Sequence, residues 1–151
     1  MTSWDEVAAA EPELAAQVRR RFAVRRHATL ATLCRDGGPR ISGTEVDFAT
    51  AGGPYLGMMP GSLKALDLRR DPRLALHSPT KDPPERDPSA WPGEAKISGR
   101  GVDLSDPDRE AQDGHRFGID VQAVVLTTVE GDVLVVTSWH PGRGLQRRER
   151  R

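Results

Sequence analysis

The sequence contains a single cysteine, Cys34, so the chain cannot form an internal disulfide bond. Its 22 acidic and 22 basic residues cancel, and it therefore lacks the basic excess that is typical of nucleic-acid-binding proteins. No stretch approaches the roughly 20 consecutive apolar residues of a membrane span, and residues 1–11 lack the apolar core of a signal peptide. These absences predict a cytoplasmic protein whose partners include neither nucleic acid nor a membrane.

Histidines are few, and no cluster of histidine and cysteine has the spacing of a metal site, so no metal ligand is predicted. Among the scattered histidines, His77 is expected on a strand and is a candidate haem ligand or proton donor. Ser62 lacks the Gly-x-Ser-x-Gly context of a hydrolase nucleophile. The sequence therefore identifies no catalytic side chain.

Most of the chain consists of short apolar or alternating runs typical of β-strands, separated by turns rich in glycine and proline. Six or seven mostly antiparallel strands with two or three short helices make the fold class mainly β (α+β), and they favour a small closed or partly closed β-barrel. The strands are expected at 28–34, 40–48, 55–59, 73–78, 94–104, 121–129 and 132–139, with helices at 12–25 and after Ser62.

The chain has 151 residues, which suits one domain with a hydrophobic core. We therefore expect a single domain over 1–151, with flexible termini at 1–10 and 144–151. The segment 79–93 holds five prolines among charged residues and is predicted to be a loop, either a functional flap or a disordered segment. Residues 105–108 could begin a short helix.

The most informative stretch is Gly61-Ser62-Leu63-Lys64, which follows the strand that ends at Met58 and Met59. A helix N-terminus presents unpaired N–H groups and a partial positive charge, so an anion can bind there. Ser62 could donate its hydroxyl to a phosphate oxygen, and Lys64 adds a full charge. Taken alone, the turn is explained more simply by an N-cap serine and a solvated lysine. Methionine adapts to flat rings, although core packing is the simpler role for at least one of the pair.

The preceding strand offers further polar groups near this turn. Arg40 could reach a phosphate beside Lys64, because a guanidinium grips phosphate through two donors. Ser42 and Thr44 share one strand face and could hydrogen-bond a planar ring. Gly43 lies between them, and a glycine within a strand lets a ligand approach the backbone closely. Alternatively, Gly43 only allows the strand to bend at a corner of the barrel, and Ser42 and Thr44 are ordinary strand residues without a ligand. The sequence favours neither interpretation over the other.

The order of these features resembles the FMN-binding split barrels of the pyridoxamine 5'-phosphate oxidase-like superfamily. That superfamily also contains the deazaflavin (coenzyme F-420) dependent reductases of actinobacteria. The resemblance covers about residues 22–104, and it implies a homodimer of six-stranded split barrels with two cofactors at the interface. It is carried by 28–33, Arg40-Ile41-Ser42-Gly43, 56–59, Ser62-x-Lys64 and 68–73.

By family position, the resemblance implies that Ser62 and Lys64 hold the cofactor phosphate, with Arg40 as a helper. The neighbouring strands would line the ring, and an aromatic residue near the C-terminus would reach toward the partner's site. The implied cofactor-binding residues are Arg40, Ile41, Ser42, Gly43, Thr44, Met58, Met59, Ser62, Lys64 and Trp139.

Two departures from the family pattern narrow the function. Leu63 stands where pyridoxamine phosphate oxidases usually have a second basic residue, and Thr44-Glu45 stands where they carry a lysine for the substrate phosphate. We therefore predict a different oxidoreductase, which uses FMN, or alternatively coenzyme F-420, to transfer hydride to or from a small organic substrate. A non-catalytic carrier of flavin, deazaflavin or haem is the second hypothesis. Contact of the arginine-rich tail, 144–151, with RNA is the third.

Overall fold

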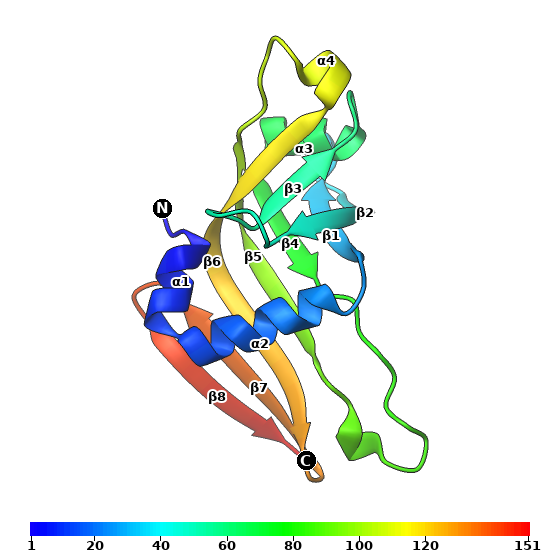
Figure 1. Cartoon of the computed structure of the whole chain (residues 1–151), viewed down its shortest axis with the longest axis vertical. Helices are drawn as coiled ribbons and strands as arrows, with labels where there is room; N and C mark the ends of the chain where they lie inside the picture. The colour runs from blue at the N-terminus through cyan, green and yellow to red at the C-terminus, as the bar shows by residue number, and fades with distance from the viewer.

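A computed structural model describes the whole chain, residues 1–151, as an eight-stranded antiparallel sheet with four α-helices and one 3-10 helix (Figure 1). The helices are α1 (Trp4–Ala10), α2 (Pro12–Ala23), α3 (Leu63–Arg70) and α4 (Glu110–Asp113), and the 3-10 helix spans Pro88–Ala90. The strands are β1 (His27–Leu33), β2 (Pro39–Asp47), β3 (Tyr55–Met58), β4 (Arg73–His77), β5 (Glu94–Asp103), β6 (His115–Glu130), β7 (Val133–His140) and β8 (Gly144–Arg150).

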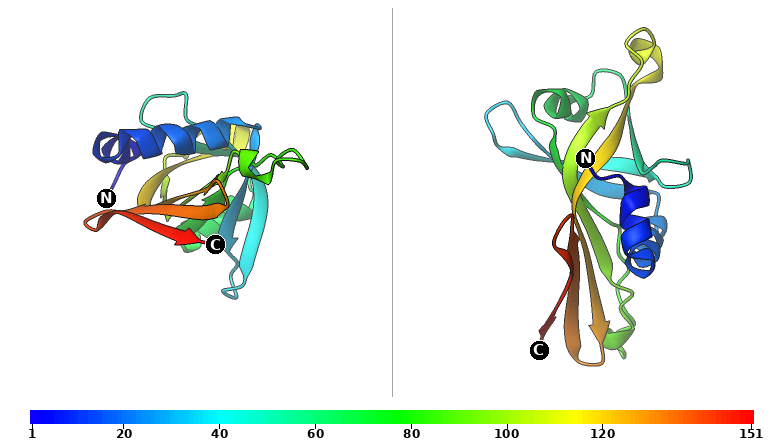
Figure 2. Two further views of the ribbon diagram at one scale, coloured as in Figure 1. Left: turned by 90° about the horizontal axis from the view of Figure 1, so that it is seen from below. Right: turned by 90° about the vertical axis from the view of Figure 1, so that its left-hand side faces the viewer.

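Six strands close into a barrel, and the last two extend the sheet beyond it. Neighbouring strands follow the order β3-β2-β1-β4-β5-β6-β7-β8, and an additional pairing of β3 with β6 joins the two ends of the six-stranded part. Figure 2 shows β7 and β8 projecting away from the barrel. The predicted mainly β, antiparallel barrel is confirmed. The sheet has one strand more than the expected upper limit because the C-terminal tail forms β8.

The long strand β6 belongs to both parts of the sheet. Near its start Phe117 pairs with Leu56 of β3, and its later residues pair with β7 in the predicted hairpin. The predicted strand starts only at residue 121, although Phe117, Ile119 and Val121 alternate with small or polar residues and are buried. Where β5 and β6 shift register, a Cβ on Gly99 would lie 2.0 Å from the carbonyl oxygen of Asp120. Glycine is therefore needed at this close approach.

The N-terminal segment 1–10, expected to be flexible, forms α1 and packs into the core. Ser3 and Glu6 form a reciprocal capping box, in which each side chain accepts from the other residue's backbone N–H. Trp4 and Val7 are buried among the core side chains. Burial of apolar surface and a satisfied helix start both stabilise this helix.

Helix α2 buries the apolar stripe that its sequence predicted. Leu14, Val18 and Phe22 are all buried, and the helix lies across β5 and β6 (Figure 1). It starts at Pro12, as expected, because proline suits the first turn of a helix. None of the four helices is both long and apolar enough to span a membrane.

The C-terminal segment 144–151, also expected to be flexible, pairs along β7 as the edge strand β8. Its side chains are exposed, and Arg147 forms an ion pair with Glu130 at 2.7 Å. The strand pairing of the tail is made by backbone groups, which residue type alone does not reveal.

In the loop 79–93 the indole of Trp91 donates to the Thr80 hydroxyl at 3.0 Å.

Candidate functional site

The turn between β3 and α3 exposes a helix start whose donors are free. Gly61 has a φ of +69°, which glycine adopts without strain, and Ser62 follows in extended conformation as the N-cap residue. The Ser62 hydroxyl makes no capping hydrogen bond, and its oxygen is buried without a partner. The N–H groups of Leu63 and Lys64 donate to no acceptor. This end of α3 therefore presents unpaired donors, the arrangement that favours an anion.

Lys64 joins this turn to the neighbouring strand β2. Its Nζ donates a hydrogen bond of 2.8 Å to the carbonyl oxygen of Gly43. The structure thus brings together the two predicted site segments, Gly61-Ser62-Leu63-Lys64 and the middle of β2. An ammonium has three donors, so Lys64 retains hydrogen-bonding capacity after this contact.

Arg40 is directed instead to a buried carboxylate. Its Nε donates to Asp67 at 2.7 Å, and Asp67 also accepts from the Thr32 hydroxyl at 2.8 Å and from Arg70 at 3.0 Å. Asp67 is only 2% exposed. Burial raises the pKa of Asp67, but the hydrogen bonds from Arg40, Arg70 and Thr32 outweigh it and hold the pKa below its ordinary value. The Nε of Arg40 therefore ties β2 to α3, and a phosphate contact by its Nη groups stays a prediction.

The remaining predicted residues of β2 divide between two faces of the strand. Ser42 and Thr44 share a face, as expected, and Thr44 is buried in the barrel. Ile41 and Gly43 lie on the outer face, where Ile41 is 75% exposed. Because successive side chains alternate, one flat ligand on the outer face cannot contact the side chains of Ser42 and Thr44 as well as that of Ile41.

On the outer face, two glycines of adjacent strands leave an open floor. A Cβ on Gly43 or on Gly57 of β3 would have no atom within 4 Å. Met59 borders this floor and is 79% exposed, whereas Met58 is buried. The two methionines therefore have the different environments that the sequence left open.

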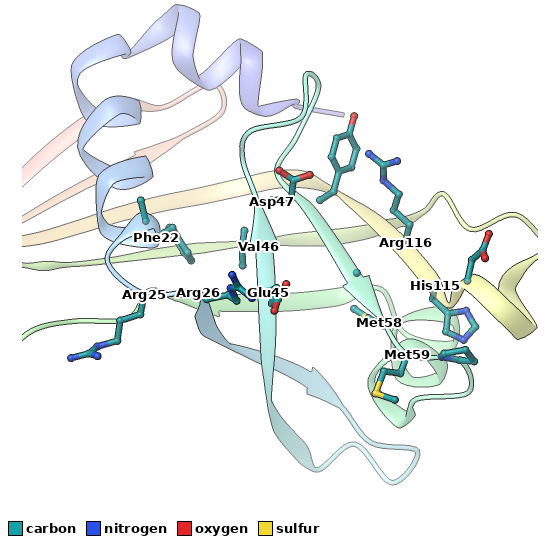
Figure 3. Close-up of a pocket in the computed structure, with 15 residues that line it drawn as sticks. Phe22, Arg25, Arg26, Glu45, Val46, Asp47, Met58, Met59, His115 and Arg116 are labelled. Carbon is teal, nitrogen blue, oxygen red and sulfur yellow. The ribbon is translucent and has the colours of Figure 1, made fainter.

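A groove of about 910 Å³ begins at the same turn (Figure 3). It is lined by the end of α2, the ends of β2 and β3, and the start of β6, and of the predicted site residues it includes Met58 and Met59. The guanidinium carbon of Arg116 lies 3.9 Å above the centre of the Tyr55 ring, a cation–π contact. Gly57 contributes to both the groove and the open floor, so the two hollows are continuous.

His115 contacts this turn through a hydrogen bond. The sequence placed it only among the scattered histidines. Its side chain is 5% exposed, and its Nε2 accepts a hydrogen bond of 3.0 Å from the Gly61 N–H. Its Nδ1 has no hydrogen-bond partner. Fifty-four residues separate the two partners, so no local pattern could have indicated this contact.

Trp139 and His77 lie away from the turn. Trp139 is 7% exposed and belongs to the hydrophobic core, so its ring is not presented to a neighbouring molecule. On β4, the Nδ1 of His77 lies 2.6 Å from the Ser78 carbonyl oxygen and its Nε2 lies 3.1 Å from Glu94. Both nitrogens of this half-exposed imidazole already have protein partners.

The sequence matches no protein-family model and no curated protein. PhzG from Burkholderia lata 383, solved with tetrahydrophenazine-1-carboxylic acid, has a TM-score of 0.63 at 11% identity over 98% of this chain and 95% of its own. A haem-binding protein from Mycobacterium smegmatis has a TM-score of 0.61 at 19% identity, and the match covers 93% of this chain but 58% of that one. A pyridoxamine 5'-phosphate oxidase-related, FMN-binding protein from Nostoc punctiforme PCC 73102 has a TM-score of 0.59 at 10% identity over 93% of this chain and 96% of its own. These similarities establish a shared split-barrel fold.

Proposed function

We propose that this protein binds FMN, or alternatively the deazaflavin coenzyme F-420, and transfers hydride between the bound ring and a small organic substrate. The observation that carries the proposal is the junction of α3 with β2. There the free donors of the α3 start lie beside a lysine that reaches Gly43 at 2.8 Å. The fold is shared with an FMN-binding protein and with haem-binding proteins, which supports binding of a planar cofactor.

The cofactor phosphate would lie at the start of α3. The buried Ser62 hydroxyl has no partner, and a phosphate oxygen would satisfy it. The unpaired N–H groups of Leu63 and Lys64 point to the same end of the helix, where the helix dipole favours negative charge. The Lys64 ammonium adds a charge-assisted hydrogen bond.

The ring would lie on the outer face of β2 and β3. Gly43 and Gly57 lie on adjacent strands, where Gly57 pairs with Glu45 and Gly43 is two residues further along β2. A Cβ at either glycine would enter the space that a ring needs. Met59 and Ile41 border this space with exposed apolar side chains. A bound flavin or deazaflavin supplies the hydride chemistry, and the protein contributes binding, orientation and exclusion of water.

A second copy of the chain would cover this face, which makes the proposed assembly a homodimer with cofactor sites at its interface. The exposed apolar side chains gather at the proposed site, where Ile41, Met59 and Leu63 are 75%, 79% and 58% exposed. A monomer gains nothing from exposing these groups together, whereas a partner would remove them from water. Light scattering after size-exclusion chromatography should give twice the mass of one chain, and a monomer at all concentrations would contradict the assembly.

Spectroscopy of the purified protein tests the cofactor proposal directly. We expect flavin or deazaflavin absorption, or saturable quenching of cofactor fluorescence when FMN or coenzyme F-420 is added. Absence of binding by either below the high micromolar range would overturn the proposal. If one of them binds, consumption of its reduced form against a panel of enones and quinones tests hydride transfer.

The second candidate is a carrier that binds a flavin, a deazaflavin or haem without turnover. It is favoured by the fold that the chain shares with a haem-binding protein. To ligate haem, His77 would have to exchange its contact with Ser78 or Glu94 for the iron. Titration with haemin should then produce a Soret shift that is lost in His77→Ala. Turnover of the reduced cofactor would reject the carrier in favour of the oxidoreductase.

A further inference from the structure

His115 lies at the start of β6, beside the turn that leads into α3 (Figure 3). The bond from the Gly61 N–H to Nε2, at 3.0 Å, connects this imidazole to the residue that precedes the N-cap. Gly61 is in the left-handed region and Ser62 is extended. The imidazole therefore supports the point where the backbone changes direction before it enters α3.

The direction of this hydrogen bond fixes which proton the ring can carry. An imidazole nitrogen that accepts a hydrogen bond has no proton of its own, so neutral His115 carries its proton on Nδ1. Nδ1 lies 3.6 Å from the Oε2 of Glu110, beyond hydrogen-bond distance. Protonation would place a second N–H on Nε2, directly facing the Gly61 N–H. Two donors cannot share this contact, so the charged ring loses its bond to the turn.

The charged groups around His115 favour the loss of its bond to Gly61 when the ring is protonated. Glu110 of α4 accepts hydrogen bonds from Arg69 of α3, which lower its pKa and keep it ionised. Arg69 is also bonded to Asp103 of β5 at 2.8 Å. An imidazolium would be attracted toward the Glu110 carboxylate, on the side opposite to Gly61. His115 and Glu110 also line a second hollow, whose other charged residues are Asp106, Arg109, Asp113 and Arg116. Arg109 and Asp113 pair with each other at 2.7 Å.

We propose that His115 is a positioning residue for the cofactor phosphate, whose neutral form holds the Gly61–Ser62 turn and whose protonated form releases it. This inference rests on the proposed cofactor site at α3. Affinity for a phosphate-bearing cofactor should therefore fall when the pH is lowered far enough to protonate this imidazole. Riboflavin has the same ring without the phosphate, so its affinity should not follow His115.

The test compares FMN binding by the wild type and by His115→Gln, at about pH 8 and about pH 5.5. A glutamine oxygen can accept from the Gly61 N–H but does not titrate. The phosphate of FMN itself takes up a proton near pH 6, and this affects both proteins alike. We expect the wild type to lose about fivefold more affinity than the variant on acidification, the equivalent of one hydrogen bond of about 1 kcal/mol. The affinity of each protein at the higher pH serves as its own reference.

Several outcomes separate this inference from the proposed function. Failure of the wild type to bind FMN at the higher pH contradicts the proposed function. Equal pH dependence in the two proteins, stronger wild-type binding at low pH, or the same difference with riboflavin contradicts the role of His115. A measurement without cofactor is the nitrogen NMR shift of the His115 ring, which should show an unprotonated Nε2 at about pH 8. On acidification, the amide proton of Gly61 should shift because it loses its hydrogen bond to Nε2. A protonated Nε2 at the higher pH would overturn the inference without reference to any cofactor.

Discussion

Asp67→Asn should destabilise the protein strongly although the substitution changes only one side-chain group. The carboxylate is 2% exposed and accepts from Thr32, Arg40 and Arg70. Removing one partner of a buried ion pair costs about 3–5 kcal/mol, because the remaining charge is left without compensation. The arginine side chains are 29% and 34% exposed, so water compensates them in part, and we expect about 3 kcal/mol, the lower end of that range.

This loss corresponds to a fall in melting temperature of about 6–12 °C for a domain of this size. Calorimetry or urea unfolding at neutral pH measures it. Asp71→Asn is the matched control, because Asp71 pairs with Arg73 at the exposed end of α3, and surface pairs contribute little. Equal stability of Asp67→Asn and the wild type would refute the assignment of Asp67 as the buried link between β2 and α3.

The same variant has a predicted pH signature. The pKa of Asp67 lies below its ordinary value of 3.8 in the folded protein, so the unfolded chain binds this proton at a higher pH than the folded chain does. The stabilisation is therefore complete above the ordinary value and is lost as the pH falls through the lowered one. The difference in unfolding free energy between the wild type and Asp67→Asn should narrow below about pH 4. A constant difference down to pH 3 would contradict this reasoning.

Three further substitutions probe the cofactor site and the core. Lys64→Ala should weaken FMN binding by about 1.5–3 kcal/mol, roughly 10- to 150-fold, and leave the melting temperature unchanged. Lys81→Ala is the exposed control. A loss of stability without a loss of affinity would make Lys64 structural. Gly43→Val should fold normally, because strands favour β-branched residues, yet abolish ring binding in fluorescence titrations; unchanged affinity would place the ring elsewhere. Trp139→Ala should lower the unfolding free energy by about 3–5 kcal/mol in urea titrations, whereas a variant of native stability that has lost cofactor affinity would return Trp139 to the site.

Local patterns predicted the elements well where a strand or helix carried its own signal. The stripe from Leu14 to Phe22 gave α2, and the turn around Glu130-Gly131 gave the hairpin of β6 and β7. The start of β6 was missed although Phe117, Ile119 and Val121 alternate there, and its pairing with both β3 and β5 became visible only in the structure. The strand in the tail escaped prediction because residues 146–150 are all polar or charged, and β8 is held by backbone pairing with β7.

The candidate site shows the same division. The sequence Gly61-Ser62-Leu63-Lys64 indicated a helix start with free donors, and the structure has one there. The position of Arg40 relative to that turn depended on Asp67, which lies 27 residues along the chain. A guanidinium near a predicted phosphate site pairs with whichever acceptor the fold places nearest, and the sequence does not rank acceptors from different elements.

By itself the sequence determined the fold class, the order of the elements from α2 to β7 and the turn that could hold an anion, because periodicity, capping and glycine–proline breaks act over a few residues. Only the tertiary structure decided that β3 pairs with β6 to close the barrel, that Asp67 binds Arg40, and that His115 supports Gly61. Those contacts join residues far apart in the chain. Their energies depend on burial and mutual geometry, which exist only after the strands have paired.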